Sequence, residues 1–406
     1  MTTGMSMGTT IPRRITVDES LPVDADRALL VGRAWVPGSL GGPTLVTIRQ
    51  GELVDIGAVA PTMAGLLALP DCAARVAAAD GPSLGALQGW LDDTCVHGPD
   101  PAHRHLLAPN DLQVVKAAGV TFAASMLERV IEERTRGDAA GAAAVRASLA
   151  GILGDRLSDV RPGSPEALRI KQILLAQGLW SQYLEVGLGP DAEIFTKAAP
   201  LASVGTGVGV GIHPRSTWNN PEPEVVLAVA PDGRIVGAAL GNDVNLRDFE
   251  GRSALLLGKA KDNNASCSVG PWIRLCDAHF GLDEIAATDI ALTVEGEDGF
   301  VMNGHSTMRQ ISRSPQELVT HAMGAHHQYP DGMMLFCGTL FAPIEDRDEP
   351  GAGFTHHQRD RVTIRAAQLG GLVNWVQDCT TLPPWTFGLG ALMHNLARRG
   401  LLHPPP

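Results

Sequence analysis

Aromatic and charged residues are both scarce in this chain of 406 residues. Aromatic residues make up 4% of it and charged residues 19%, while hydrophobic residues reach 44%, which is too apolar for a disordered chain. Lys and Arg number 32 against 44 Asp and Glu, so the formal net charge is −12, and no stretch is rich in basic residues. Because a protein that binds a phosphate backbone needs a basic surface, we expect no nucleic acid partner.

Closely spaced cysteines and long apolar segments are also lacking. The six cysteines lie far apart in the sequence and none belongs to a CxxC motif, which argues against a zinc ribbon and against a disulfide-rich scaffold. No segment approaches the ~20 consecutive apolar residues of a membrane span. The N-terminal sequence MTTGMSMGTTIPRR lacks the apolar core of a signal peptide. These absences predict a cytoplasmic protein with reduced thiols and no membrane partner.

The length and the change of pattern along the chain predict two domains. Residues 1–110 alternate strand-like runs with Gly and Pro turns, which indicates an N-terminal α+β domain. Residues 111–406 are helical in pattern at first and then, after Gly189, show short apolar runs separated by turn signals, which indicates a mainly β domain. Apolar residues at helical spacing predict helices over residues 63–79, 112–136, 139–153 and 164–177.

Three acidic residues follow a pattern that brings them together in a β-hairpin. Glu222 and Glu224 are two residues apart, so in an extended chain they share a face. They precede a continuous apolar run at 225–229 that fits a strand buried on both faces. A Pro-Asp-Gly turn and a return strand follow. If Pro231 is opposite Arg234, opposing residue numbers sum to 465, and Asp243 lies opposite Glu222.

Three carboxylates on one buried patch need compensation, because like charges directly opposite each other destabilise a sheet. Either their pKa values shift or a cation binds between them. Hard cations such as Mg²⁺ and Ca²⁺ prefer oxygen ligands, and no His or Cys stands nearby to favour zinc. Alternatively, the two glutamates are a solvated strand end and the aspartate caps a turn.

The order of these motifs resembles the fumarylacetoacetate hydrolase superfamily. Its members carry an ExE strand, then a strand of the type (N/D)DV followed by RD, and then a lysine ahead of Gly-Pro. In this chain the first two segments read PEPEVVLAV and GNDVNLRD, and a lysine stands nine residues before a Gly-Pro. The resemblance implies a divalent metal, usually Mg²⁺ with Mn²⁺ or Ca²⁺ as alternatives, bound by Glu222, Glu224 and Asp243.

The resemblance also implies further site residues and an architecture. Lys261 would be the active-site lysine, with Lys259 as the less well placed alternative, and Thr339 in the segment DGMMLFCGTL would bind the substrate carboxylate. The implied fold class is α+β and mainly β. A fumarylacetoacetate-hydrolase-like mixed β-sandwich roll would carry the site, with the N-terminal α+β domain and lid helices beside it. Members of the superfamily are commonly homodimers or homotetramers.

Three more segments resemble the 2-keto-3-deoxy-pentonate (arabinonate or xylonate) dehydratases. AEIFTKAAP places Glu193 where these enzymes have an active-site glutamate, and STMRQISRSP matches a segment that faces the pocket. RSTWNNPEPE places Arg215, Ser216 and Trp218 at the substrate. The implied function is a lyase of pentose oxidative catabolism that converts a 2-keto-3-deoxy sugar acid to 2,5-dioxopentanoate (α-ketoglutarate semialdehyde).

In that reaction the metal would chelate the carboxylate and keto oxygens of the sugar acid and polarise the ketone. Lys261, near the cation and partly desolvated, is expected to have a lowered pKa and to transfer protons. Glu193 would help the C4 hydroxyl depart or act as a further metal ligand.

Two other functions remain open from the sequence. One is hydrolysis of a C–C bond in an acylpyruvate or a 2,4-diketo-3-deoxy acid at the same metal site. Hydrolases of the superfamily usually carry a His–Glu dyad on the lid. Residues 117–133 contain no histidine, although Glu128 or Glu132 could serve as a base. The other is a non-catalytic metal-binding protein with the same fold, which would have no need of Lys261 and Thr339.

Overall fold

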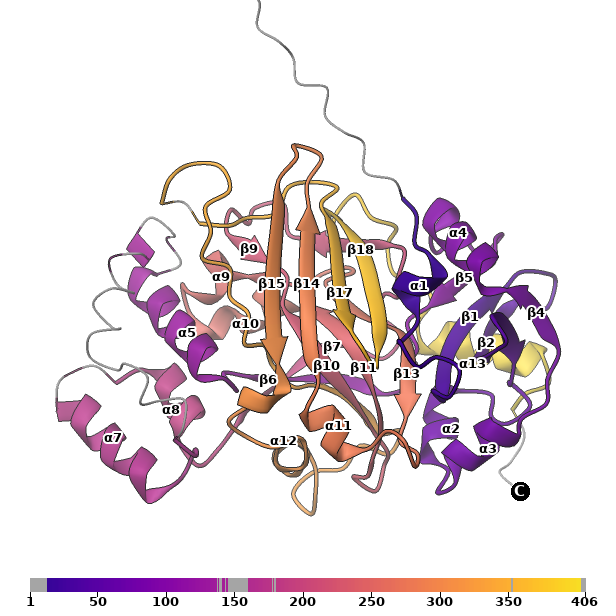
Figure 1. Ribbon diagram of the computed structural model, residues 1–406, viewed down its shortest axis with the longest axis horizontal. Helices are drawn as coiled ribbons and strands as arrows, with labels where there is room; N and C mark the ends of the chain where they lie inside the picture. The colour runs from indigo at the N-terminus through magenta and orange to yellow at the C-terminus, as the bar shows by residue number, and fades with distance from the viewer. Residues whose placement is uncertain are drawn as a thin grey trace, which may run out of the picture.

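Two packed β-sheets form the centre of the molecule, and helices flank them at both ends (Figure 1). This computed structural model describes residues 13–402 except 137, 139–140, 143, 145–159, 177, 179 and 352. The helix expected over residues 139–153 falls almost entirely outside the described residues. Leu227 and Leu240 of the larger sheet share one apolar cluster with Leu292 and Ile364 of the smaller sheet. The expected mainly β, α+β class is confirmed.

The larger sheet contains the N-terminal strands and the hairpin with the acidic residues. Among the described residues its strand order is β4 (Ser83–Ala86), β3 (Glu52–Asp55), β2 (Gly42–Arg49), β1 (Leu30–Val36), β13 (Cys267–Leu275), β11 (Ile235–Asp243), β10 (Pro223–Val229), β16 (Met333–Phe336), β6 (Val114–Gly119) and β7 (Glu193–Ala198). The short β5 (His105–Leu107) pairs with β1. Every residue of β10 is buried, as the continuous apolar run of this strand predicts.

The smaller sheet packs on one face of the larger one. Within the described part of the chain its strand order is β15 (Val301–Thr307), β14 (Asp289–Glu295), β17 (Arg361–Ala366), β18 (Gly370–Asp378) and β8 (Gly209–Ile212). Buried and accessible residues alternate along β14 and β17, because one face of the sheet meets the core and the other faces outward. Two further strands, β9 (Asn219–Asn220) and β12 (Asn245–Leu246), pair with each other.

Helices gather at the two ends of the sandwich. At one end lie α5 (Ala123–Thr135), α7 (Pro165–Ala176) and α8 (Gln182–Leu188), of which α7 confirms the helix expected over residues 164–177 (Figure 1). The remaining helical segments are α1 (Val17–Ser20), α2 (Met63–Ala68), α3 (Cys72–Ala78), α4 (Leu87–His97), α9 (Arg247–Glu250), η3 (Ala254–Leu256), α10 (Leu257–Lys261), α11 (Leu282–Ala286), η4 (Met308–Gln310), α12 (Pro315–Ala322) and α13 (Leu389–Arg398).

Two of the expected helices are wrong in part. Residues 63–79 form α2 and α3 rather than one helix, because Pro70 lies between them and lacks the amide that a helix interior needs. Residues 112–136 begin as strand β6, which pairs with β16 on one side and β7 on the other, and become helical only in α5. A short apolar run does not distinguish a buried strand from a buried helix, and here sheet pairing decided.

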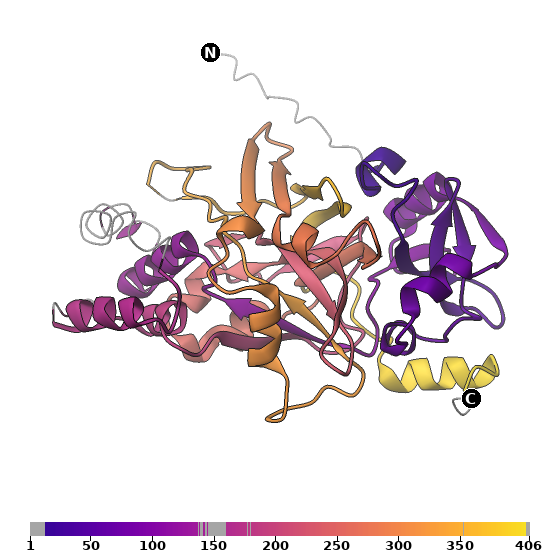
Figure 2. The same ribbon diagram turned by 60° about the horizontal axis from the view of Figure 1, so that its bottom comes forward.

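The N-terminal strands extend the larger sheet, since β1 pairs with β13 through Leu30 opposite Arg274 and Val31 opposite Ile273. Helix α13, near the other end of the chain, lies beside these strands (Figure 2), and the Asn395 side chain donates to the Gly41 carbonyl at 2.7 Å. The division of the chain into domains at residue 110 stays a prediction.

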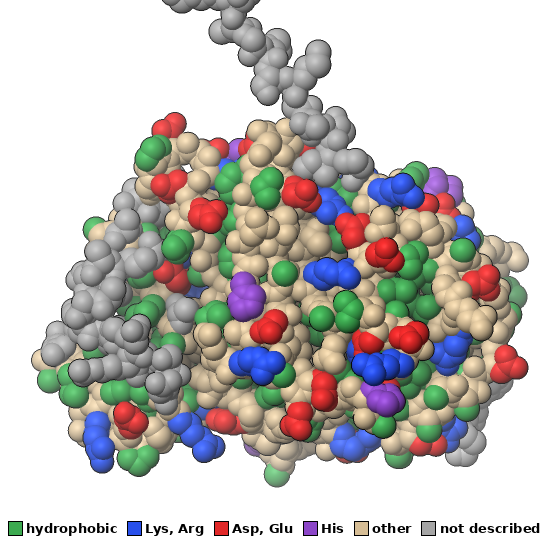
Figure 3. All heavy atoms as spheres, viewed as in Figure 1, with side chains coloured by type: hydrophobic (Ala, Val, Ile, Leu, Met, Phe, Trp, Pro, Cys, Tyr) green, Lys and Arg blue, Asp and Glu red, His purple; other side chains and the backbone are tan. Residues whose placement is uncertain are grey.

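The surface matches the composition. On the face shown in Figure 3, Lys and Arg side chains stand scattered among Asp and Glu side chains rather than gathered into a basic patch. In the part of the chain that the structure describes, the helices are too short or too polar for any of them to cross a membrane.

Candidate functional site

The hairpin of β10 and β11 brings the three acidic residues together. Glu224 pairs with Gly241, so the opposing residue numbers sum to 465 as expected. The amide of Asp243 donates to the carbonyl of Glu222 at 3.0 Å. The predicted opposition of Glu222 and Asp243 is therefore confirmed.

The expected register is wrong at the turn itself. The amide of Ala230 donates to the Arg234 carbonyl at 2.9 Å, so Ala230 rather than Pro231 lies opposite Arg234. Pro231 has no amide hydrogen to contribute to the ladder, and the loop contains three residues, ending in Gly233 with a φ of +86°. A register shift between Ala228 and the next residue restores the sum of 465 before the acidic residues are reached.

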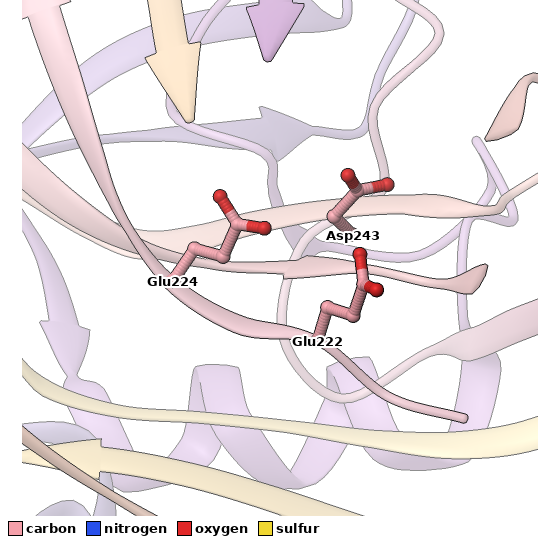
Figure 4. Close-up of side chains that lie close together, drawn as sticks. All are labelled: Glu222, Glu224 and Asp243. Carbon is pink, nitrogen blue, oxygen red and sulfur yellow. The ribbon is translucent and has the colours of Figure 1, made fainter. Parts of the chain in front are cut away.

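The three carboxylates point toward one another across the hairpin (Figure 4). Glu222 lies just before β10, Glu224 on it and Asp243 at the end of β11. All three residues are buried, and one oxygen atom from each lies within 4.8 Å of the other two. Oxygen ligands that share one ion at roughly 2.0–2.6 Å are at most about twice that distance apart, so the spacing suits a single hard cation.

Burial and neighbouring charges set the protonation of the cluster. Burial, and then the charges of Asp243 and Glu222, raise the pKa of Glu224 well above its ordinary value, although the amide of Gly338 donates to its carboxylate at 2.6 Å. Burial also opposes ionisation of Asp243, but Lys197 and Lys261 outweigh it and hold the pKa of Asp243 below its ordinary value. In this arrangement Glu224 keeps its proton and Asp243 is ionised.

Two buried lysines neutralise Asp243, one at each carboxylate oxygen. Lys197 of β7 lies 2.8 Å from Oδ1, and Lys261 at the end of α10 lies 3.1 Å from Oδ2. Lys261 also donates to Oε2 of Glu222 at 2.5 Å. Lys197 donates to the backbone carbonyls of Val244 and Lys261, and so ties β7 to both elements that carry the site.

Of the two candidate lysines, Lys261 lies at the acidic cluster and Lys259 lies at the surface. The pKa of Lys261 differs from the expected one. Lys261 is 2% exposed and lines the cavity at the cluster. Lys259 is exposed, and its Nζ lies 3.3 Å from Nε2 of His213. The expectation of a lowered pKa for Lys261 is wrong here: burial lowers it, but Asp243 and Glu222 outweigh burial and raise the pKa of Lys261 above its ordinary value.

The lid helix α5 contributes a guanidinium to the same site. Arg129 lies 2.7 Å from Glu222, 2.7 Å from Glu132 and 2.6 Å from Glu250 of α9. Burial raises the pKa of Glu250 to about 7, although Arg129 and Lys261 partly offset it. Helix α5 thus contacts the acidic hairpin through an ion pair, and none of its residues is a histidine.

A second arginine, Arg247, pairs with the lid carboxylates. Its Nε donates to Glu132 at 2.7 Å and its Nη2 to Glu128 at 2.9 Å, while its guanidinium stacks 4.1 Å from the ring centre of Trp218. Burial opposes ionisation of Glu132, but Arg129 and Arg247 hold its pKa below the ordinary value. Both lid glutamates are therefore ion-pair partners in this structure, and a role as base stays a prediction.

A cavity lies at the acidic cluster, with about 30 Å³ open to the centre of a water molecule. Glu193, Thr339 and Lys261 line it together with the three acidic residues, as expected. Burial raises the pKa of Glu193. The residues that line the cavity and that the sequence analysis did not single out include Arg129, Asn220, Arg247 and Glu250.

The other three expected substrate-binding residues do not line the cavity. The hydroxyl of Ser216 donates to Asp248 at 2.8 Å, and Trp218 is buried behind Arg247. Arg215 is exposed. Direct contact of these three residues with a substrate stays a prediction.

The donor set fits a hard divalent cation. Three buried carboxylates supply oxygen ligands only, which suits Mg²⁺, Mn²⁺ or Ca²⁺ better than zinc. Among the described residues that line the cavity, carboxylates, including Glu193 and Glu250, outnumber the basic side chains. A cation would relieve that surplus.

The sequence profile of the fumarylacetoacetate hydrolase C-terminal domain matches residues 224–377. This part of the chain is similar to the fumarylacetoacetate hydrolase family. The matched residues contain Glu224, Asp243, Lys261 and Thr339, and Glu222 precedes them by two positions. The family resemblance noted from the motifs is thereby confirmed.

Two curated relatives match about half of the chain. A probable 2-keto-3-deoxyxylonate dehydratase of Haloferax volcanii is 29% identical over 194 residues, which cover 48% of this chain and 63% of the relative. The 2-dehydro-3-deoxy-D-arabinonate dehydratase of Saccharolobus solfataricus is 30% identical over 185 residues, which cover 46% of this chain and 58% of the relative. The chain thus spans about three fifths of the length of these relatives.

Solved structures share the fold. A 2-keto-3-deoxyarabinonate dehydratase superimposes with a TM-score of 0.59 at 19% identity, over 86% of this chain and 99% of that one. A 2-keto-3-deoxy-D-arabinonate dehydratase complexed with magnesium and 2,5-dioxopentanoate gives a TM-score of 0.57 at 19% identity, with the same coverage of both chains. These likenesses confirm the expected fold of the fumarylacetoacetate hydrolase family.

Several cavity residues had no recognisable signal in the sequence. Arg129 and Glu250 lie among other charged residues, and nothing in their spacing separates them from surface charges. Lys197, which pairs with Asp243 but does not line the cavity, stands in the segment AEIFTKAAP four residues after Glu193. Asn220 lies two residues before the ExE motif, and nothing in the sequence there distinguishes it from its neighbours.

Proposed function

We propose that this protein is a metal-dependent hydro-lyase that dehydrates a 2-keto-3-deoxy-pentonate to 2,5-dioxopentanoate. The observation that carries the proposal is one buried cavity in which Glu222, Glu224 and Asp243 lie beside Lys261 and Glu193. The similarity to curated dehydratases of this substrate class supports it. So does the lid helix α5, which presents arginine and glutamate but none of the histidine that hydrolases of the family usually use.

We assign Glu222, Glu224 and Asp243 as the ligands of Mg²⁺, with Mn²⁺ or Ca²⁺ as alternatives. A divalent cation held there would supply Lewis acidity that polarises the 2-keto group and acidifies the protons at C3, an effect worth several kcal/mol of barrier. The sugar acid would bind by its carboxylate and keto oxygens, with Thr339 as a donor to the carboxylate.

The chain's own residues would move the protons. Dehydration breaks a C3–H bond and the C4–O bond, so one group must accept a proton and another must give one to the departing hydroxyl. Glu193 suits the second task, because it lines the cavity and burial raises its pKa, which favours the protonated form. Lys261 lines the same cavity and would accept the C3 proton once a cation bound to Glu222 and Asp243 had offset the two charges that raise its pKa. Loss of water leaves a C3=C4 double bond, and transfer of a proton from C5 to C3 then gives an enol that tautomerises to 2,5-dioxopentanoate.

The negative net charge of the chain does not oppose an anionic substrate. Lys261, Arg129 and Arg247 all line the cavity, and a bound divalent cation would add two positive charges to them. Electrostatic attraction of a carboxylate depends on these nearby groups, since exposed charges farther than a Debye length of about 8 Å are largely screened at physiological salt.

The decisive experiment is a product assay with 2-keto-3-deoxy-pentonates, the corresponding hexonates and acylpyruvates in the presence of Mg²⁺. Release of 2,5-dioxopentanoate from a pentonate, abolished by EDTA and restored by Mg²⁺, is the expected result. Release of pyruvate would show cleavage of a C–C bond and overturn the dehydratase. Mg²⁺ binding without turnover of any substrate would favour a non-catalytic protein.

The proposal has four further parts, of which the oligomeric state and the metabolic role rest on the family resemblance. The protein would assemble as a homodimer or homotetramer, act in the cytoplasm, and serve the oxidative catabolism of pentoses. The N-terminal residues 1–110 and the catalytic residues 111–406 would be separate domains. Size-exclusion chromatography with light scattering tests the first part, and separate expression of residues 111–406 tests the division.

A further inference from the structure

Arg129 joins three structural elements at the edge of the acidic cluster. Its Nη2 donates to Oε1 of Glu222 at the start of the hairpin, and its Nη1 contacts Glu132 on α5 and Glu250 on α9. The side chain is only 12% exposed and lines the cavity. Among the described residues of the lid, Arg129 is therefore a cation in direct contact with a proposed metal ligand.

A cation bound at the cluster would compete with Arg129 for Glu222. Glu222 already accepts from Lys261 at 2.5 Å through its other oxygen, so Arg129 holds the oxygen that remains. A metal bound by Glu222 would repel the Arg129 guanidinium and weaken the contact of Nη2 with Oε1, while Glu132 and Glu250 would still hold Nη1. A buried charged donor without an acceptor is costly, so Nη2 requires a new oxygen atom in the cavity.

The same cavity holds an unpartnered acceptor. The Nδ2 group of Asn220 donates to the carbonyl of Pro221 at 2.8 Å, which leaves Oδ1 as the atom with no partner among the described residues. Asn220 is 2% exposed and lines the cavity. A guanidinium that only donates and an amide oxygen that only accepts together match a hydroxyl group, which does both.

We propose that Arg129 is a substrate-binding residue that exchanges Glu222 for the hydroxyl end of the sugar acid when the metal binds. Asn220 accepts the hydrogen of the same part of the substrate. This inference rests on the proposed function for the identity of the substrate. Its physical content is a competition: the residue that recognises the hydroxyl groups is also the cation that the metal displaces.

The competition predicts the sign of a change in metal affinity. Replacing Arg129 by glutamine removes a positive charge beside Glu222 and removes the cation that the metal must displace, so Mg²⁺ binds more tightly. A residue that merely held the lid in place would give the opposite result, because its loss would loosen the ligands. The substrate, in contrast, loses a charged donor and binds more weakly.

The test compares Arg129→Gln with Arg134→Gln, which removes an exposed arginine from the same helix. Isothermal titration with Mg²⁺ alone should give a Kd about tenfold lower for Arg129→Gln than for the wild type, and an unchanged Kd for the control. At saturating Mg²⁺, Kd or KM for the 2-keto-3-deoxy-pentonate should rise about 10- to 100-fold. Binding of pyruvate, which lacks the hydroxyl end, should not change.

Several results would overturn the inference: weaker or equal Mg²⁺ binding in Arg129→Gln, or equal losses for pyruvate and for the sugar acid. If Arg129→Gln does not fold, as judged by circular dichroism, Arg129→Lys keeps the charge and loses the forked geometry. It should then bind the sugar acid more weakly than the wild type at unchanged pyruvate affinity. If the wild type turns over no sugar acid, the proposed function fails, while the Mg²⁺ titration still judges the competition.

Discussion

Glu224 and Asp243 occupy the same cluster, yet their replacement by amides should have opposite effects on stability. Glu224 keeps its proton, because burial and the charges of Asp243 and Glu222 raise its pKa well above the ordinary value. Glutamine has nearly the shape of a protonated glutamate and accepts the same hydrogen bond from Gly338. Asp243 is ionised and pairs with two buried lysines, which an asparagine leaves uncompensated.

The magnitudes follow from these contacts. Breaking a buried ion pair from one side costs about 3–5 kcal/mol, so Asp243→Asn should lose at least that much of the free energy of unfolding. Glu224→Gln should lose less than about 1 kcal/mol at pH 5, because it leaves no buried charge without a partner. The difference between the two variants is large against a total stability of about 5–15 kcal/mol.

The effect of Glu224→Gln should also depend on pH, with a definite sign. In the unfolded chain glutamate ionises near pH 4.5, whereas the folded protein keeps its proton to higher pH. Above pH 4.5 folding must therefore take up a proton, and the wild type loses stability relative to the glutamine variant as the pH rises, by up to about 1.4 kcal/mol per pH unit. The two proteins should converge as the pH falls to 4.5.

Urea unfolding in EDTA at pH 5 and pH 8 measures both effects, and the same titration with Mg²⁺ tests the ligand assignment. Mg²⁺ should stabilise the wild type and should stabilise Glu224→Gln much less, since the variant has lost one ligand. A loss of more than about 2 kcal/mol for Glu224→Gln in EDTA would refute the protonated state. An Asp243→Asn variant as stable as the wild type would refute the ion-pair reasoning.

Three other predictions concern single side chains. Lys261→Met should lower kcat at least ~100-fold while Lys259→Met, the exposed control, keeps the wild-type rate; equal rates for both would remove Lys261 from catalysis. Lys197→Met should cost about 3–5 kcal/mol in urea unfolding, and a neutral result would mean that Asp243 does not need two cations. Asp360 is buried and pairs with Arg347 at 2.5 Å and with His356 at 3.0 Å. Although burial opposes ionisation, these two partners hold the pKa of Asp360 at about 2 against an ordinary 3.8. Asp360→Asn should therefore lose at least about 2 kcal/mol at pH 7, a gap that closes as the pH falls from 3.8 to 2 and that acid titrations of both proteins would reveal.

The proposed metal ligands could be recognised from the sequence because they lie close together in it. Glu222, Glu224 and Asp243 lie on two adjacent strands joined by a short turn, so strand periodicity and pairing alone place them on one face. The predicted pairing of the acidic residues is correct although the predicted turn is not. Pro231 lies in the loop rather than opposite Arg234, and a register shift next to Ala228 restores the expected pairing. Lys261 could also be predicted, because it stands nine residues before a Gly-Pro as in the family motif.

Helix and strand boundaries were harder to predict where a segment pairs with strands that are distant in the sequence. The run at 114–119 has the composition of a buried helix, and it is a strand only because β16 and β7 lie on either side of it. Pro70 marks the break between α2 and α3 in the sequence, because proline disrupts the interior of a helix. Both errors concern segments whose state depends on neighbours rather than on their own periodicity.

By itself the sequence determined the acidic hairpin, the family resemblance and the mainly β class, since each depends on spacing over a few tens of residues. Only the tertiary structure decided the electrostatics of the site. The pKa of Lys261 is raised rather than lowered because carboxylates from two strands surround it. Arg129 belongs to the site because α5 packs over the hairpin, 93 residues away along the chain. Charges act through space, so the strengths and partners of buried ionic groups follow from the folded arrangement and not from their order in the chain.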